Sequence, residues 1–123
     1  MVGRVMSEDN FIIYHNPRCS KSRETLKLLQ DNGVEPEIVE YLKGGLSVAV
    51  VKDILEVLDC SVRDILRMKE VDYKDNGLSD VSLSDGDLIG AIVKFPKILE
   101  RPIVIRGRDG VVGRPPENVL SLL

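Results

Sequence analysis

The chain has 123 residues, of which 43% are hydrophobic and 30% are charged, a composition typical of one compact globular domain. Its formal net charge is −3 at pH 7, which argues against a general affinity for nucleic acid or for an anionic membrane surface. No apolar run approaches the roughly 20 residues that a membrane-spanning helix needs. Any binding site for an anion must therefore be a local cluster of basic groups.

The first ten residues contain no apolar stretch of the kind found in secretory signals. We expect residues 1–10 to be a flexible extension that precedes a single domain over residues 11–123. The sequence has two cysteines, Cys19 and Cys60, and the absence of a signal favours free thiols over a structural disulfide. We therefore expect a cytoplasmic protein.

The beginning of the chain predicts a strand–helix–strand unit. Residues 11–14 are apolar, aromatic and β-branched, as in a short strand, and residues 15–18 form a loop with an Asn-Pro turn signal. Helical periodicity follows over about residues 20–32 and ends at Gly33, a suitable C′ residue. A second strand is predicted at about residues 37–41. The whole unit has the usual size of a βαβ motif.

The middle of the chain, about residues 46–95, predicts a helical insertion. Apolar residues recur there at helical spacing, and Pro96 ends the last of these helices. Residues 69–82 are polar, and we expect a loop or short turns. Each predicted helix is preceded by a serine suited to cap it, namely Ser47, Ser61 and Ser84.

The end of the chain returns to strands. Residues 103–105 form a continuous apolar run, and residues 111–112 are the expected antiparallel partner. Residues 108–110 contain Asp-Gly, which predicts the hairpin turn between them. Residues 115–123 open with prolines and predict a last helix. The element order is β-α-β, a helical insertion, and β-β-α.

Cys19 follows a strand and a proline-containing loop and immediately precedes a predicted helix. The unpaired N–H groups and the dipole at a helix N-terminus favour an anion, so the pKa of this thiol should lie below its ordinary value of about 8.5. His15 and Arg23 lie four residues before and after it. We expect their positive charge to assist the thiolate, with His15 acting when it is protonated.

The sequence contains no C-x-x-C motif, because Ser22 occupies the position three residues after Cys19. An oxidised Cys19 would therefore be reduced by a thiol from outside the protein. Cys60 follows a predicted helix and stands near Asp59 and Asp64. Burial and negative charge both raise the pKa of a thiol, so we interpret Cys60 as structural.

The run Tyr14–Arg23, with the letters YHNPRCSKSR, resembles the signature of the glutaredoxin-coupled arsenate reductase family. The resemblance extends from about residue 11 to the C-terminus. Further matching segments follow in order: Glu35-Pro36, Tyr41-Leu42, Ser61-Val62-Arg63, Leu66-Arg67, Arg101-Pro102-Ile103-Val104 and Gly113-Arg114-Pro115.

The resemblance implies an α/β thioredoxin-like fold, with a mixed sheet and an inserted helical subdomain. It also implies that Cys19 is the catalytic nucleophile, that His15 assists it and that the Arg101-Pro102 peptide bond is cis. The oxyanion-binding residues that the resemblance implies are Arg67, Arg101 and Arg114. We also expect Ser22 and Arg23 to take part in substrate binding. Arginine suits such a site because its planar fork holds a tetrahedral oxyanion with paired hydrogen bonds.

The implied reaction is the reduction of arsenate to arsenite through a cysteine–arsenic adduct on Cys19, with glutathione as co-substrate and glutaredoxin as partner. We expect no bound cofactor, no metal, no nucleic-acid or membrane partner, and a monomer. One alternative is a related glutathione-dependent thiol oxidoreductase that does not act on arsenate. Another is a redox-sensing regulator that binds RNA polymerase, although such proteins typically carry the C-x-x-C that Ser22 interrupts here.

Overall fold

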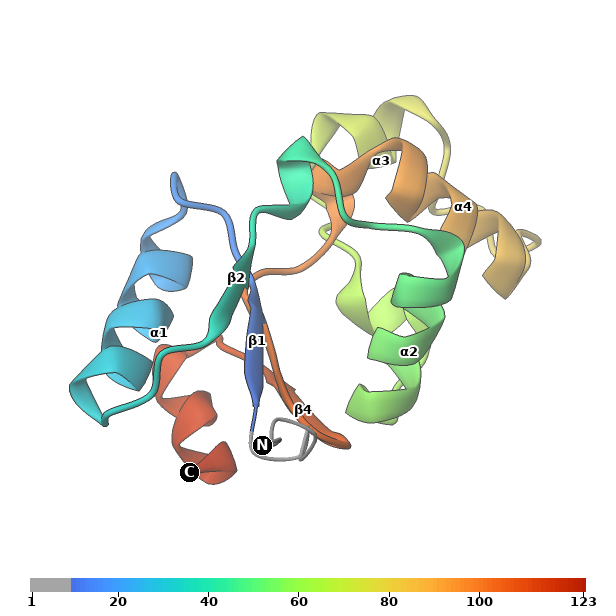
Figure 1. The fold of residues 1–123 in the computed structure, drawn as a ribbon. Coiled ribbons are helices and arrows are strands. Elements are labelled where there is room, and N and C mark those ends of the chain that lie inside the picture. The colour runs from blue at the N-terminus through green and yellow to red at the C-terminus, as the bar shows by residue number, and fades with distance from the viewer. Residues whose placement is uncertain (1–9) are drawn as a thin grey trace. The chain divides into compact units, whose positions relative to one another are not determined.

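The computed structural model describes residues 10–123, so the predicted extension lies almost wholly outside the described residues. The chain divides into two compact units. The first unit runs to Lys43 and resumes at Arg101–Leu123, and the second comprises Gly44–Glu100. Figure 1 shows that the strands belong to the first unit and that the second is built from helices and turns.

The first unit contains one mixed four-stranded sheet, as the sequence predicts. Its strands are β1 (Phe11–Tyr14), β2 (Glu37–Val39), β3 (Ile103–Arg106) and β4 (Asp109–Val112), in the order β2-β1-β3-β4. Strand β1 is parallel to β2 and antiparallel to β3, and β3 is antiparallel to β4. The chain crosses from β1 to β2 through helix α1 (Ser20–Asp31), which confirms the βαβ unit.

Helix α1 ends where the sequence predicts. Gly33 has φ +81°, the left-handed conformation that favours glycine. Its N–H donates to the Gln30 carbonyl at 3.0 Å, and the Val34 N–H donates to the Leu29 carbonyl at 2.9 Å. These two bonds form a Schellman motif, which satisfies carbonyls that the helix leaves unpaired.

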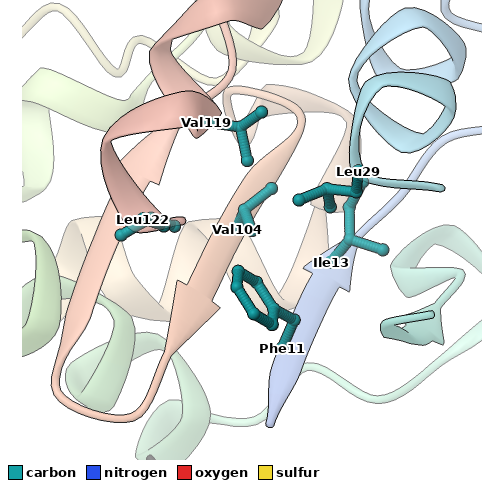
Figure 2. Packing of buried hydrophobic residues seen from close by; sticks show 6 residues of the cluster. All are labelled: Phe11, Ile13, Leu29, Val104, Val119 and Leu122. Carbon is teal, nitrogen blue, oxygen red and sulfur yellow. The ribbon is translucent and has the colours of Figure 1, made fainter. Parts of the chain in front are cut away.

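The core of the first unit lies between the sheet, α1 and a C-terminal 3₁₀-helix, η6 (Pro116–Leu122). The last helix is thus a 3₁₀-helix in place of a regular α-helix. Figure 2 shows how the core side chains converge from β1, α1, β3 and η6. They are Phe11, Ile13, Leu29, Val104, Val119 and Leu122, none more than 9% exposed.

Strand β2 is shorter than predicted, because it ends at Val39 instead of residue 41. The following residues tighten into a 3₁₀-helix, η3 (Tyr41–Lys43), in which the Lys43 N–H donates to the Glu40 carbonyl at 2.9 Å. The Tyr41 side chain is 1% exposed. The change from a strand to a 3₁₀-helix accompanies the burial of this aromatic ring. An apolar strand pattern does not reveal that change, because a tyrosine suits a strand equally well.

The hairpin turn also differs from its prediction. Arg106 pairs with Asp109, so the two turn residues are Gly107 and Arg108, and the predicted turn residue Gly110 lies in β4 opposite Ile105. Gly107 has φ +60°. A positive φ at the first central position of a two-residue turn matches the twist of the flanking strands, and glycine meets that requirement without strain.

Helices of the second unit begin at the predicted serine caps. The Ser47 hydroxyl accepts from the Val50 N–H at 3.1 Å at the start of α2 (Val48–Leu58). The Ser84 hydroxyl accepts from the Asp87 N–H at 3.1 Å at the start of α4 (Asp85–Lys94), and the Asp87 carboxylate accepts from the Ser84 N–H at 3.0 Å. This reciprocal pair is a capping box.

Three shorter helices complete the second unit. Ser61 precedes the 3₁₀-helix η4 (Val62–Ile65), and Pro96 opens the 3₁₀-helix η5 (Pro96–Ile98) directly after α4. The segment predicted as loop contains a one-turn α-helix, α3 (Val71–Asp75), with Tyr73 buried. The polar composition of this segment predicted a loop, and the burial of its one aromatic residue, Tyr73, was not evident from the sequence. The buried faces of α2 and α4 contribute Val51, Ile54, Leu88, Ile89 and Ile92 to this unit's core.

Candidate active site

Cys19 is the N-cap residue of α1, and the loop before it is held by Asn16. The Arg23 N–H donates to the Cys19 carbonyl at 3.0 Å, which is the first hydrogen bond of the helix. The Cys19 N–H donates to the Asn16 carbonyl and the Arg18 N–H donates to Asn16 Oδ1, both at 3.0 Å. Asn16 is only 8% exposed. The buried Asn16 therefore anchors the loop, and the loop places the Cys19 sulfur at the helix N-terminus.

Topology brings two arginines to the same place. Tyr14 of β1, Ile103 of β3 and Val112 of β4 lie in one row across the sheet. Cys19 follows the first of these strands, Arg101 precedes the second and Arg114 follows the third. All three side chains thus belong to segments at one end of the sheet.

The two guanidinium groups lie beside the sulfur. Arg114 Nη1 is 3.8 Å from Cys19 Sγ and donates to the Arg101 carbonyl at 3.2 Å, and the side chain of Arg101 also hydrogen-bonds the sulfur. The Arg101-Pro102 bond is cis, which confirms the prediction, and the Arg114-Pro115 bond is also cis, which the sequence did not indicate.

These contacts lower the pKa of Cys19. Burial is the largest single influence and raises the pKa of the thiol, but several hydrogen bonds together outweigh it. They come from the backbone N–H of Ser22, the side chain of Arg101 and the backbone N–H of Lys21, and the charge of Arg101 acts in the same direction. The predicted direction is confirmed, since these contacts favour the Cys19 thiolate more than the surroundings of an ordinary cysteine do.

His15 is a buried residue that contacts the nucleophile loop through Ser22. Its side chain is 5% exposed, and burial, aided by the charge of Arg23 and opposed by that of Glu40, lowers its pKa below 6.5. The imidazole is therefore neutral at pH 7. The nearby charge that lowers the pKa of Cys19 is that of Arg101, and the assistance expected from His15 stays a prediction.

Ser22 connects His15 to the nucleophile loop. Its hydroxyl lies 2.6 Å from His15 Nδ1 and accepts from the Asn16 N–H at 3.0 Å. Ser22 is completely buried, so its hydroxyl is occupied by the loop, while its backbone N–H serves the Cys19 sulfur. This geometry gives the Ser22 hydroxyl a positioning function in the loop, and the part of Ser22 in substrate binding stays a prediction.

Arg23 turns toward the loop as well. Its Nη1 donates to the Pro17 carbonyl at 3.0 Å, and the residue is exposed. The guanidinium that was expected to assist the sulfur is therefore hydrogen-bonded to the Pro17 carbonyl, and the part of Arg23 in substrate binding stays a prediction.

Arg67 belongs to the second unit, where two carboxylates engage its guanidinium. Nη1 lies 2.8 Å from Glu100 Oε1, and Nε lies 3.5 Å from Glu70 Oε2. An antiparallel bridge between Leu66 and Leu99 holds Arg67 and Glu100 together, and the Arg67 N–H donates to the Ile98 carbonyl at 2.7 Å. The role of Arg67 in substrate binding stays a prediction.

Cys60 fits its structural interpretation. It is a free thiol in the second unit, and its pKa is raised by burial and by the charges of Asp64 and Asp59. A protonated thiol is a poor nucleophile at neutral pH.

Sequence reasoning missed two residues of this arrangement. Asn16 had a usable signal, since Asn before Pro was identified as a turn, but its role as the buried anchor of the loop was not apparent. Glu100 had none, because its contact with Arg67 spans 33 residues of chain.

Two further observations concern only residues 10–123. Within that range no group of three His, Cys, Asp or Glu side chains is placed to hold a metal ion. Over the same residues, every helix is too short or too polar to cross a membrane.

Comparison with known proteins agrees with this geometry. The sequence matches the ArsC family over residues 14–122. It is 53% identical over 112 residues to the protein YfgD of Escherichia coli K12, covering 90% of this chain and 94% of the relative. It is 46% identical over 113 residues to an arsenate reductase of Haemophilus influenzae, covering 91% and 97%.

A solved structure, an arsenate reductase from Vibrio cholerae, superimposes with a TM-score of 0.91 at 45% sequence identity, over 93% of this chain and 98% of that one. The predicted thioredoxin-like fold, with its mixed sheet and helical segment, is thereby confirmed. Since the family match spans most of the sequence and includes Cys19, Arg101 and Arg114, the chain belongs to the ArsC family.

Proposed function

We propose that this protein reduces arsenate to arsenite at Cys19, with glutathione and glutaredoxin supplying the electrons. The observation that supports this most directly is the set of donors around one sulfur. The backbone N–H groups of Lys21 and Ser22 and the guanidinium of Arg101 stabilise the thiolate, and Arg114 lies 3.8 Å away. The names of relatives, such as the arsenate reductase of Haemophilus influenzae, support the choice of substrate.

Arsenate suits this arrangement by charge and shape. It is a tetrahedral oxyanion with one to two negative charges near neutral pH, and guanidinium groups bind such anions through charge-assisted hydrogen bonds. Arg101 and Arg114 are the proposed oxyanion-binding residues, with Arg67 as a third. Donors placed where negative charge develops on the arsenic oxygens would also stabilise the transition state.

The proposed reaction balances in four steps. The Cys19 thiolate attacks arsenic(V), an S–As bond forms, and one As–O bond breaks with release of water after protonation. The glutathione thiol then displaces a second oxygen as water and becomes bonded to arsenic. Attack by a glutaredoxin thiolate on the glutathione sulfur forms a disulfide and leaves the electron pair on arsenic, which becomes arsenic(III). Hydrolysis then releases arsenite and restores the Cys19 thiol.

The need for an outside reductant follows from the residues around the nucleophile. Ser22 stands where a second cysteine of a C-x-x-C motif would stand, and the pKa of Cys60 is raised. The steps above use only thiols, so we propose that no bound cofactor takes part. A cytoplasmic location would supply glutathione in its reduced form, and we propose that the protein acts there as a monomer.

The test is a coupled assay with purified protein, arsenate, glutathione and glutaredoxin. We expect Cys19→Ser to lose turnover by at least a thousandfold, because serine is not ionised at neutral pH. Cys60→Ser is the matched control and should keep more than half of the activity.

Equal loss in both variants would contradict the single-cysteine scheme. Turnover of glutathione mixed disulfides without any reduction of arsenate would assign the protein to the alternative class of thiol oxidoreductases.

A further inference from the structure

Gly113 occupies a position at which the surrounding atoms leave no room for a side chain. It follows β4 directly and precedes Arg114. A Cβ atom there would lie 2.7 Å from Thr25 Oγ1, 3.0 Å from Thr25 Cγ2 and 2.9 Å from Pro102 Cγ. Carbon atoms pack at about 3.5–4.0 Å, so any side chain would have to displace these neighbours. The φ of Gly113 lies outside the left-handed region, so the close approach, and not the backbone conformation, requires glycine.

Thr25 brings helix α1 against this glycine. Thr25 is fully buried, and its hydroxyl is shared between the carbonyl oxygens of Lys21 at 2.8 Å and Gly113 at 3.4 Å. The contact with Gly113 joins residues that are 88 positions apart in the sequence. Cys19 is the N-cap residue of the same helix. The contact therefore sets how far the helix that presents the sulfur lies from the end of β4.

The backbone of Gly113 also joins the two segments that carry the arginines. Its N–H donates to the Pro102 carbonyl at 2.9 Å, just beyond the last paired residues of β3 and β4. Arg101 precedes that proline, and Arg114 follows the glycine. This hydrogen bond therefore holds the two arginine-bearing segments side by side. Two guanidinium groups repel each other, so their shared position beside the sulfur depends on the backbone that carries them.

We propose that Gly113 and Thr25 are positioning residues for oxyanion binding, because their contact sets the separation between the nucleophile helix and Arg114. This inference rests on the proposed function for the oxyanion site itself. Arg114 Nη1 lies 3.8 Å from Cys19 Sγ. A methyl group added at residue 113 would force α1 and the end of β4 apart, and Arg114 is the next residue. Misplacement of a binding group by about 1 Å costs about a hundredfold, so a smaller displacement should cost about tenfold.

The test compares two glycine-to-alanine variants in a Cys60→Ser background. Gly113→Ala inserts a methyl group into the contact. Gly90→Ala, in α4, is the matched control: among residues 10–123, a Cβ atom at Gly90 would meet nothing within 4 Å beyond its chain neighbours and the backbone of its own helix. The probe is inorganic phosphate, a tetrahedral oxyanion that does not react with thiols. Its binding is measured by the protection of Cys19 from alkylation by iodoacetamide.

We expect Gly113→Ala to weaken phosphate protection by about tenfold, while the alkylation rate without phosphate changes by less than about twofold. That rate should hold because the groups that lower the pKa of Cys19 are backbone N–H groups of α1 and the side chain of Arg101. Gly90→Ala should leave both quantities unchanged. Adding Thr25→Ala to Gly113→Ala removes two of the three close atoms, so it should restore phosphate protection by about threefold or more.

Phosphate protection of Gly113→Ala equal to that of the parent would overturn the inference. An equal fall in the alkylation rate without phosphate would overturn it too, since the substitution would then have damaged the site as a whole. A loss that Thr25→Ala does not reverse would show that the contact between the two residues is not its cause.

Thr25→Val is the second test if Gly113→Ala does not fold. It replaces the hydroxyl that faces Gly113 by a larger methyl group, and it should weaken phosphate protection by about two- to fourfold. Unchanged protection in this variant would overturn the inference, as would a parent protein that phosphate does not protect. Because no reduction of arsenate is measured, a parent that phosphate protects but that does not reduce arsenate would contradict the proposed function alone.

Discussion

Replacement of Arg101 by glutamine should make Cys19 a much weaker nucleophile at neutral pH. The Arg101 side chain hydrogen-bonds the sulfur, and its charge further favours the thiolate. Glutamine is shorter than arginine and carries no charge, so the charge-assisted hydrogen bond to the sulfur is lost. The pKa of Cys19 should therefore rise, because burial raises it and less remains to oppose that effect.

The size of the effect follows from the kind of interaction that is lost. A hydrogen bond to a charged group contributes about 1.5–3 kcal/mol, and the lower end applies here because Cys19 is partly exposed to screening solvent. A difference of about 1.4 kcal/mol is a tenfold change in an ionisation constant. The alkylation rate on the acid side of the titration should thus fall by about tenfold.

The assay is the rate of alkylation by iodoacetamide between pH 4 and pH 10, in a Cys60→Ser background so that one thiol reacts. Arg101→Lys should give an intermediate loss, since lysine keeps the charge but not the planar fork. Arg108→Gln removes a charge from the hairpin and should behave as the parent. If the titration midpoint of Arg101→Gln equals that of the parent, Arg101 does not stabilise the thiolate and the reasoning fails.

Two further predictions concern stability. Because the pKa of His15 is lowered, the unfolded chain binds a proton at a higher pH than the folded protein does, so the free energy of unfolding should decrease as the pH falls below 6.5. In urea titrations, His15→Gln should show a smaller decrease. Parallel pH profiles of the two proteins would contradict this. Leu29→Ala should lower the free energy of unfolding by about 2–5 kcal/mol, because Leu29 is fully buried. The control Leu120→Ala, at a 44% exposed position, should lower it by less than about 1 kcal/mol. Equal losses of stability in the two variants would contradict the assigned core.

Much of the fold was predictable because its signals are local. Ser47 and Ser84 cap helices through hydrogen bonds to residues only three positions away. Gly33 ends α1 through its own backbone conformation. The βαβ unit and the terminal hairpin follow from short apolar runs between such signals. The error at the hairpin arose because Asp-Gly and Gly-Arg both suit a two-residue turn, and pairing across the sheet selects between them. The error at residue 41 arose because the burial of Tyr41 in a 3₁₀-helix is not distinguished by a strand pattern.

Only part of the candidate site could be predicted from the sequence. A cysteine directly before a helix predicts a lowered thiol pKa, because the backbone donors to its sulfur come from the next three residues. The choice among the nearby cations was not local. His15 and Arg23 are closer in sequence to Cys19 than Arg101 is, yet burial makes His15 neutral and the Pro17 carbonyl holds Arg23. Without the family resemblance, no spacing would have selected Arg101 and Arg114.

The buried hydrogen bonds that join Ser22 to His15 and Asn16 explain how one loop can expose the sulfur and also hold its donors in fixed positions. A thiolate needs an exposed position for reaction, whereas its donors need fixed positions to stabilise it. Asn16 and Ser22 are buried and hydrogen-bonded to each other, so the backbone N–H groups at the start of α1 are held in place from beneath. A neutral His15 fits this function, because a buried charge there would require a partner of its own. The rigidity of the loop thus comes from groups that do not touch the sulfur, which leaves the exposed side of Cys19 to arginines and to an incoming anion.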